Sequence, residues 1–327
     1  MPVIDIHTHM MSDRWLALLR AHGGPSYTIA PGKSGASVIH EDGAPFLVMT
    51  PGMLDYGARL KAMDAAGVDL AVISLTCPNV YWGDAQTSEE AARTINDDMR
   101  AAEAAHPDRI RHLASLPWQY PQAATAELER ACANGAVGVM VLANIRGRPL
   151  TDPLFAPVWR AIDARGLPVL VHPTTPPGAK EAALGQFNLI ATVGFVYDTT
   201  LAITRMVMDG FLDRFPNLKL IAAHGGGAIP FISQRIERFF ALTAASRENI
   251  SRPPSSYFAR LYYDAVVYQN NALQAVIDLA GASHVLYGSD YPHQTGDMPG
   301  CLKRVDALPP DQREAIRGRN AQALFGL

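Results

Sequence analysis

The chain has 327 residues, of which 48% are hydrophobic and 18% charged, and its formal net charge is −3 at pH 7. This composition is ordinary for a globular protein with enough apolar side chains for a large core. The charge balance, without any run of Lys and Arg, argues against a nucleic acid or an anionic membrane as a partner.

The cysteines and the start of the chain bear on the cellular compartment of the protein. Cys77, Cys132 and Cys301 are far apart and odd in number, which argues against a disulfide framework and favours a reducing compartment. No apolar run approaches the roughly 20 residues of a membrane span. The first predicted strand begins at residue 3, which leaves no room for a signal peptide. We therefore expect a cytoplasmic protein.

Short apolar runs rich in Val, Ile and Leu recur along the chain, mostly separated by amphipathic stretches that end at Gly or Asn. The runs occupy residues 3–7, 68–76, 109–117, 136–144, 167–173, 218–227, 260–268 and 282–292. They do not alternate with polar residues, as expected for parallel strands that are buried on both faces. Eight such strands with mostly helical crossovers predict one (β/α)8 barrel domain over residues 1–327. An open doubly wound sheet is the alternative, but no GxGxxG follows the first strand.

Two irregular segments interrupt this pattern, and the beginning of one helix can be predicted within it. Residues 20–54 are rich in Gly, Pro and Ser, and we interpret them as an insertion over the active-site face rather than a domain. A second irregular segment, residues 172–188, follows the fifth strand. Long loops at that end of a barrel usually carry function. Ser88, followed by two glutamates, predicts the N-cap of a helix.

Four histidines and an aspartate stand at the ends of the predicted strands. His7 and His9 end the first strand and point to the same face because they are two residues apart. His172, His224 and Asp290 end the fifth, sixth and eighth strands. A barrel brings the carboxyl ends of its strands to one rim, so these side chains would gather there. Three imidazoles and one carboxylate suit Zn²⁺ or a similar divalent ion.

Other residues near strand ends limit the number of ions and suggest contacts to a substrate. A second ion would need a bridging Glu or modified Lys on the fourth strand, which ends instead at Asn144. We therefore expect one divalent ion. Asn144 and Trp82, which follows the second strand, are candidates for substrate binding, with a capped turn and ordinary packing as their alternatives. The glycines after His224 favour either a tight turn or the close approach of a substrate.

These motifs resemble those of the metal-dependent amidohydrolase superfamily, and within it the branch of aminocarboxymuconate-semialdehyde decarboxylase. The resemblance runs nearly end to end and includes DIHTH at 5–9, LPVLVHP at 167–173, AHGGGAIPF at 223–231, RPPSSY at 252–257 and YGSDYP at 287–292. It implies the same barrel. It also implies that His7, His9, His172 and Asp290 hold the metal and that His224 is the acid/base.

Members of this branch mostly cleave the bond between a carboxylate and an unsaturated or aromatic carbon without an organic cofactor. The resemblance therefore implies a metal-dependent non-oxidative decarboxylase of a small unsaturated or aromatic carboxylic acid, in which His224 manages protonation. A metal ion can also lower the pKa of bound water to about 7, and Asp290 could accept its proton. A hydrolase or hydratase acting on a lactone, an amide or an unsaturated acid is thus the alternative. A third hypothesis is that the protein binds a metal as a scaffold without catalytic activity.

Arginines bear on the charge of the substrate, because a guanidinium holds a carboxylate with two parallel hydrogen bonds. By the resemblance, two arginines clamp the substrate of that decarboxylase, and one of them comes from the partner in a homodimer. Arg235 matches the partner's arginine, with a solvated helix face as the alternative, whereas Leu47 stands where the other would align. Leu47 favours a less charged, more apolar acid. His293 stands where relatives commonly carry Phe, and we interpret it as a solvated loop residue, with contact to the substrate as the alternative.

Overall fold

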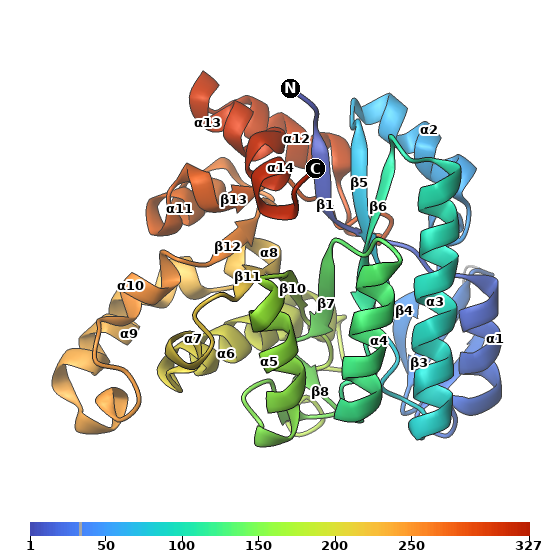
Figure 1. The fold of residues 1–327 in the computed structure, drawn as a ribbon, viewed down its shortest axis with the longest axis horizontal. Coiled ribbons are helices and arrows are strands. Elements are labelled where there is room, and N and C mark those ends of the chain that lie inside the picture. The colour runs from blue at the N-terminus through green and yellow to red at the C-terminus, as the bar shows by residue number, and fades with distance from the viewer. Residues whose placement is uncertain (33–34) are drawn as a thin grey trace.

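The computed structural model describes residues 1–32 and 35–327, and the barrel dominates it (Figure 1). Eight parallel strands within these residues form one sheet in the order β1, β5, β6, β7, β10, β11, β12, β13. Their bounds are Ile4–His9, Leu70–Ser74, Ile110–Ser115, Gly138–Leu142, Pro168–His172, Lys219–Ala222, Tyr262–Asp264 and Val285–Leu286. The Ile6 amide donates to the Tyr287 carbonyl at 3.0 Å, and Thr8 bridges to Tyr291, so the first strand lies beside the end of the last. The predicted (β/α)8 barrel is confirmed, and the doubly wound alternative is wrong.

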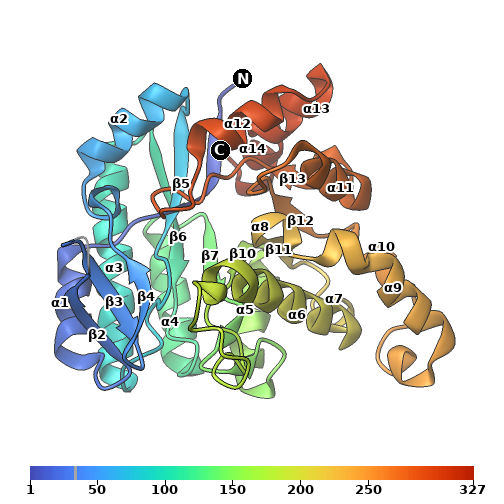
Figure 2. The ribbon, with the colours of Figure 1, turned by 180° about the vertical axis from the view of Figure 1, so that it is seen from behind.

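Helices cover the outside of the barrel (Figures 1 and 2). Their bounds are α1 Asp13–His22, α2 Tyr56–Ala66, α3 Ala85–Ala105, α4 Pro121–Ala133, α5 Ala156–Arg165, α6 Phe195–Met208, α7 Phe211–Arg214, α8 Ala223–Gly226, α9 Ile229–Leu242, α10 Pro254–Phe258, α11 Asn270–Ala280, α12 Met298–Asp306, α13 Pro310–Glu314 and α14 Asn320–Phe325. The predicted N-cap at Ser88 is wrong. The helix begins about one turn earlier, because the Asp84 side chain accepts from the Thr87 amide at 2.8 Å and caps it.

Burial of the strands explains why the apolar runs lack polar alternation. Every residue of β1, β7 and β10 is buried, since one face of each strand packs inside the barrel and the other against helices. The same burial makes polar residues in these strands informative. In β1 the buried polar residues include Asp5, His7 and His9, which contribute to or support the site described below.

Part of the Gly/Pro-rich segment forms a small antiparallel sheet beside the barrel. Its strands are β2 (Tyr27–Pro31), β3 (Ser37–Glu41) and β4 (Ala44–Val48), in that order. The turn before β4 uses Gly43 at a φ of +80°. Residues 20–22 belong to α1, and residues 33–34 lie outside the described part of the chain. A two-residue strand pair, β8 (Asn144–Ile145) with β9 (Arg148–Pro149), follows β7.

Two findings concern membranes and disulfides. Among the described residues, no helix combines the length and the apolar character that crossing a membrane requires. Cys77, Cys132 and Cys301 are all free thiols. The absence of a disulfide framework agrees with the spacing of the cysteines in the sequence.

Candidate active site

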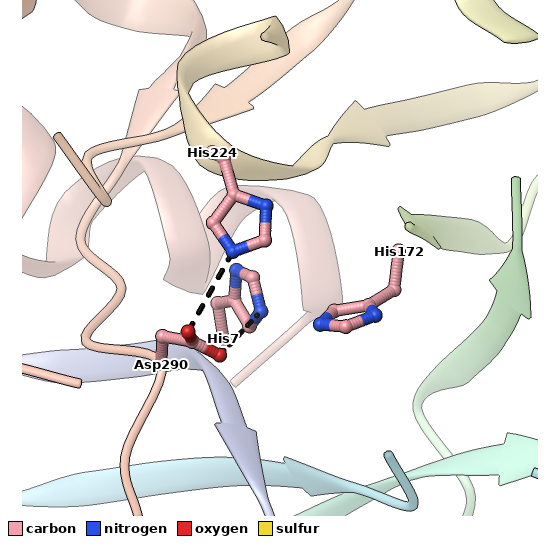
Figure 3. Close-up of side chains that lie close together, drawn as sticks. All are labelled: His7, His172, His224 and Asp290. Carbon is pink, nitrogen blue, oxygen red and sulfur yellow. Dashed lines mark ion pairs between the residues drawn. The ribbon is translucent and has the colours of Figure 1, made fainter. Parts of the chain in front are cut away.

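Four side chains that are predicted to bind a metal converge at the carboxyl end of the barrel. His7 and His9 come from the end of β1, His172 ends β10, and Asp290 lies in the loop after β13. The ring centroids are 5.0 Å apart for His7 and His9, 5.1 Å for His7 and His172, and 4.8 Å for His9 and His172. Asp290 Oδ1 lies 3.4 Å from His7 Nε2 and 3.3 Å from His9 Nε2. Figure 3 shows His7, His172 and Asp290 facing one another, with His224 beside them.

The atoms that face the centre of this cluster have no partners within the described residues. They are Nε2 of His7, His9 and His172 and Oδ1 of Asp290, all of them buried. Buried polar atoms are normally hydrogen bonded, so these unpaired atoms need an explanation. Ligand atoms of His7, His172, His224 and Asp290 lie within 4.8 Å of one another, and so do those of His9, Asp290 and His293. Imidazole nitrogen and carboxylate oxygen are both ligands of borderline divalent ions. The residues present therefore fit one divalent cation.

Hydrogen bonds on the far side of each ring fix the orientation of the three histidines. They join His7 Nδ1 to Asp264 Oδ2 at 2.5 Å, His9 Nδ1 to Ser74 Oγ at 3.1 Å, and His172 Nδ1 to the Pro173 carbonyl at 2.7 Å. The carbonyl oxygen can only accept, so Nδ1 of His172 carries the proton and its Nε2 presents a lone pair. Metal-binding histidines are typically oriented in this way.

Burial and the neighbouring charges determine the protonation of the cluster. Burial lowers the pKa of His9 to about 3 and the pKa of His172 well below its usual value. Burial acts the same way on His7, but the carboxylates of Asp264 and Asp290 outweigh it and raise the pKa of His7 to about 10. Burial would raise the pKa of Asp290, but the surrounding histidines hold it well below its usual value. A divalent cation that binds here must therefore displace a proton from His7.

Asp264 joins the proposed metal ligand His7 to the proposed acid/base His224. The Asp264 carboxylate accepts from the His224 amide at 2.9 Å and from the Gly225 amide at 2.9 Å, in addition to His7 Nδ1. His224 Nε2 lies 3.6 Å from Asp290 Oδ2, and its Nδ1 is buried without a partner among the described residues (Figure 3). Asp264 did not figure in the sequence analysis. Its position at the end of the seventh strand, at the same rim as the histidines, was the available signal.

The glycines after His224 are required by the backbone. His224 has a φ of +54°, and Gly225, Gly226 and Gly227 have φ values of +61°, +78° and +66°. A Cβ on Gly226 would lie 2.6 Å from Cε1 of Tyr263, and one on Gly227 would lie 2.5 Å from the Thr200 hydroxyl oxygen. The tight-turn interpretation therefore accounts for these glycines. A non-glycine residue with positive φ, such as His224, is typical of a functional site.

We expect Gly226→Ala to destabilise the fold more than Gly67→Ala. Both positions have left-handed backbone, which costs a side chain roughly 1–2 kcal/mol. Gly67, at a φ of +73°, has nothing within 4 Å of an added Cβ, whereas Gly226 meets the Tyr263 ring. Overpacking should therefore cost Gly226→Ala about 1–3 kcal/mol more. Urea unfolding of the two variants measures the difference, and equal free energies of unfolding would contradict the packing argument.

A cavity of about 600 Å³ opens beside the cluster. Its apolar walls include Phe46, Leu47, Val48, Phe195, Val196, Val266 and Val267. At the metal end it is lined by His172, His224, Asp290 and His293, and no Lys or Arg lines it among the described residues. A concave, mostly apolar site with a few convergent polar groups is typical of small-molecule binding. Cys77 also lines it, but burial raises the pKa of its thiol to about 12, so the thiol stays protonated.

The structure does not bring the three predicted substrate-binding residues to this cavity. Trp82 and Asn144 line a neighbouring cavity of about 260 Å³. Trp82 Nε1 donates to a backbone carbonyl of its own loop at 2.8 Å, and Asn144 Nδ2 donates to the Asp198 carboxylate at 3.1 Å. Arg235 is exposed on α9, with its guanidinium 5.1 Å from the centroid of the Phe239 ring. These contacts agree with the structural alternatives for Trp82 and Asn144.

His293 lies in the site, so the interpretation of this residue as a solvated loop histidine is wrong. Its side chain lines the 600 Å³ cavity, and its ring centroid is 5.0 Å from that of His9. Its Nε2 pairs with Thr76 Oγ1 at 2.9 Å. The signal in the sequence was its position three residues after Asp290. That spacing alone could not indicate on which side of the loop the ring lies.

The barrel and the cluster together define the class of protein: an enzyme that holds a divalent ion at the carboxyl ends of parallel strands. A family model described as Amidohydrolase matches residues 4–327. The chain therefore belongs to this amidohydrolase family, and the resemblance found in the sequence is confirmed.

Three similar proteins are named as decarboxylases. The chain is 30% identical to 2-amino-3-carboxymuconate-6-semialdehyde decarboxylase from Dictyostelium discoideum, and the match covers 99% of this chain and 91% of the relative. The crystal structure of 5-carboxyvanillate decarboxylase from Sphingomonas paucimobilis superposes with a TM-score of 0.87, at 28% identity, over 100% of this chain and 99% of that one. Dihydroxybenzoic acid decarboxylase from Polaromonas sp. JS666, with bound manganese and an inhibitor, shares the fold at a TM-score of 0.83 and 24% identity, over 100% and 97%.

Proposed function

We propose that the protein is a metal-dependent, non-oxidative decarboxylase of a small aromatic or unsaturated carboxylic acid. His7, His9, His172 and Asp290 hold the ion, and His224 is the acid/base. The observation that carries this proposal is the set of four buried, unpaired ligand atoms beside His224, at the end of an apolar cavity. Two of these relatives support decarboxylation over hydrolysis or hydration, because both are named as decarboxylases.

An ion held by His7, His9, His172 and Asp290 would supply a Lewis acid that orients the polar groups of the substrate. His224 supplies the proton. As the bond to the carboxylate breaks, its electron pair stays on the ring carbon, and His224 protonates that carbon while CO2 leaves. His224 then regains a proton from water, so the net change is loss of CO2 and gain of one proton by the ring. Asp264 holds the backbone of His224 in place for this transfer.

The lining of the cavity supports an apolar substrate with a single carboxylate. Leu47 of β4 lies in the cavity wall, and among the described residues no basic side chain lies there. A second carboxylate would find no ion-pair partner among the residues that its own protomer contributes to this pocket, which is costly. We therefore place the substrate among aromatic monocarboxylic acids, in agreement with the departure at Leu47.

For the ion, we propose Zn²⁺, since three imidazoles and one carboxylate are a common ligand set for it. Manganese in the Polaromonas enzyme makes Mn²⁺ the rival. Elemental analysis of the purified protein, followed by activity after chelation and reloading with each ion, distinguishes the two. The three free thiols support a reducing, cytoplasmic location.

We also propose a homodimer in which α9 lies at the interface. In Figures 1 and 2, α9 and α10 extend away from the barrel. The side chains of Phe231, Phe239 and Leu242 on α9 are 91%, 48% and 62% exposed. Exposed apolar groups of this size typically mark an interaction surface. Arg235 lies among them and would reach the cavity of the partner.

Mixing two inactive variants tests this arrangement. If Arg235 acts in the partner's cavity, a mixture of His224→Ala and Arg235→Ala proteins should regain about a quarter of the wild-type activity, because half the dimers are mixed and each has one intact site. No recovery despite verified subunit exchange would contradict a shared site.

The function itself is tested by mass spectrometry of the metal-loaded protein with a panel of aromatic acids, lactones and amides. We expect loss of one CO2 from an aromatic monocarboxylic acid and no change in the lactones or amides. Addition of one water, or release of hydrolytic fragments, would instead establish the hydrolase or hydratase alternative.

A further inference from the structure

His293 lies in the site but has no part in the proposed chemistry. It is not among the four proposed ligands, and it is not the acid/base. It nevertheless lines the cavity next to Asp290 and His224. The lining also includes the polar side chains of Asn188, Gln269 and Gln294, but His293 lies beside the proposed metal ligand His9. A polar group at the reacting end of a cavity is a candidate for recognition of the substrate.

Two hydrogen bonds hold His293 in position. Its backbone amide donates to the Asp290 carbonyl at 3.1 Å. Its Nε2 pairs with the hydroxyl of Thr76, a buried residue that follows β5, at 2.9 Å. The residue is therefore held on two sides, by the loop that carries Asp290 and by Thr76, just beyond the end of β5. A side chain held in this way loses little entropy when it binds a ligand.

The second ring nitrogen of His293 remains available. Nδ1 makes no hydrogen bond to any described residue, and the side chain lines the cavity. The ring of His293 lies against His9, whereas the ring of His224 lies 5.1 Å from His7 and 5.6 Å from His172. The two histidines therefore contact different members of the cluster. A substrate bound between them would meet the acid/base on one side and a hydrogen-bonding nitrogen on the other.

A second metal ion is a poorer explanation of this geometry. Ligand atoms of His9, Asp290 and His293 do lie within 4.8 Å of one another. However, His9 Nδ1 is already paired with Ser74, so only its Nε2 is free, and that atom faces Asp290 Oδ1 at 3.3 Å. A neutral imidazole nitrogen has one lone pair and cannot serve two ions. Binding at His293 would then rest on too few ligands.

We propose that His293 is a substrate-binding, specificity-determining residue whose Nδ1 hydrogen bonds to a neutral polar substituent, such as a hydroxyl, on the ring of the acid. This inference rests on the proposed function for the class of substrate. When the Thr76 hydroxyl donates to Nε2, Nδ1 of the neutral ring carries the proton and donates; when the hydroxyl accepts from Nε2, Nδ1 accepts. A hydroxyl matches either role. A second carboxylate is a poorer match, since no Lys or Arg of the same chain lines the cavity among the described residues.

Binding measurements on metal-loaded protein test the proposal. The probes are benzoate and its three monohydroxy isomers, and the proteins are wild type, His293→Phe and His293→Gln. Phe keeps a flat ring without nitrogen, and Gln restores a hydrogen-bonding group. Wild type should bind at least one hydroxy isomer several-fold more tightly than benzoate, as expected for one added hydrogen bond of about 0.5–1.5 kcal/mol. His293→Phe should lose this preference but bind benzoate and the metal as wild type does, and His293→Gln should recover part of it.

The outcomes separate this proposal from the proposed function. An unchanged preference in His293→Phe would overturn the role of His293, and so would a wild type without any preference. Loss of the metal in both variants would assign His293 to the metal site instead. Release of CO2 is measured on the same proteins. If no acid loses CO2 while the preference still depends on His293, then the proposed function fails and the binding role stands.

Discussion

Replacing His224 with Asn is expected to lower kcat by about 10²–10⁴-fold, the usual contribution of general acid–base catalysis, without loss of the metal. The reason is the position of His224. Its side chain lines the cavity and stands 3.6 Å from Asp290, while the other three histidines present the unpaired Nε2 atoms that fit an ion. Asn cannot hold and release a proton near neutral pH. The measurements are kcat and the metal content of the purified variant.

A matched control for this variant is His22→Asn, since His22 is exposed at the end of α1. The control should keep the activity of the wild type. A His224→Asn protein that is folded, metal-loaded and fully active would show that another group supplies the proton. Loss of the metal from this variant alone would instead make His224 a ligand.

Asp290→Asn should abolish turnover and release the ion. Asp290 is the only anionic member of the proposed ligand set, and its carboxylate lies within 3.4 Å of two ligand nitrogens. The amide is neutral and a weaker ligand. The loss of metal affinity should therefore exceed the 10–100-fold that is typical of changes to outer-shell partners. Titration with a competing chelator measures the affinity, and an exposed residue in α11 provides the control Asp278→Asn. Full activity of Asp290→Asn would refute the metal site.

The barrel could be predicted because its strands are buried on both faces, which leaves a plain apolar signal. β1, β7 and β10 contain no exposed residue. β7 and β10 appear in the sequence as apolar runs, whereas β1 carries Asp5, His7 and His9 among its apolar residues. The small sheet of β2, β3 and β4 has no such signal. Every residue of β2 is exposed or half-buried, and Pro and polar residues occur within the three strands. Its pairing depends on contacts that a local pattern does not contain.

The convergence of the proposed metal ligands could be predicted for a geometric reason. The ends of parallel strands meet at one rim, so His7, His172 and Asp290 had to lie close together. The position of side chains in the loops could not be predicted in this way. His293 reaches Thr76, 217 positions earlier in the chain, because the loop after Asp290 turns its ring inward. Arg235 is exposed on α9, as both a contact to a partner subunit and a solvated helix face require, so the single chain does not distinguish these two predictions.

Because the proposed ligands come from both ends of the chain, we expect the ion to bind only after the barrel has closed. Asp5 accepts from the Ser289 hydroxyl at 2.5 Å across the seam, 284 positions apart, and His7 and Asp290 lie on the two sides of the same seam. A chain that has formed every strand except the last cannot assemble the ligand set. An ion that binds only the closed barrel stabilises it by mass action, by about 4.1 kcal/mol at 1,000 times its Kd. Chelation during refolding should therefore leave the rates of the early folding steps unchanged. It should destabilise the closed barrel, in which the first strand pairs with the end of the last.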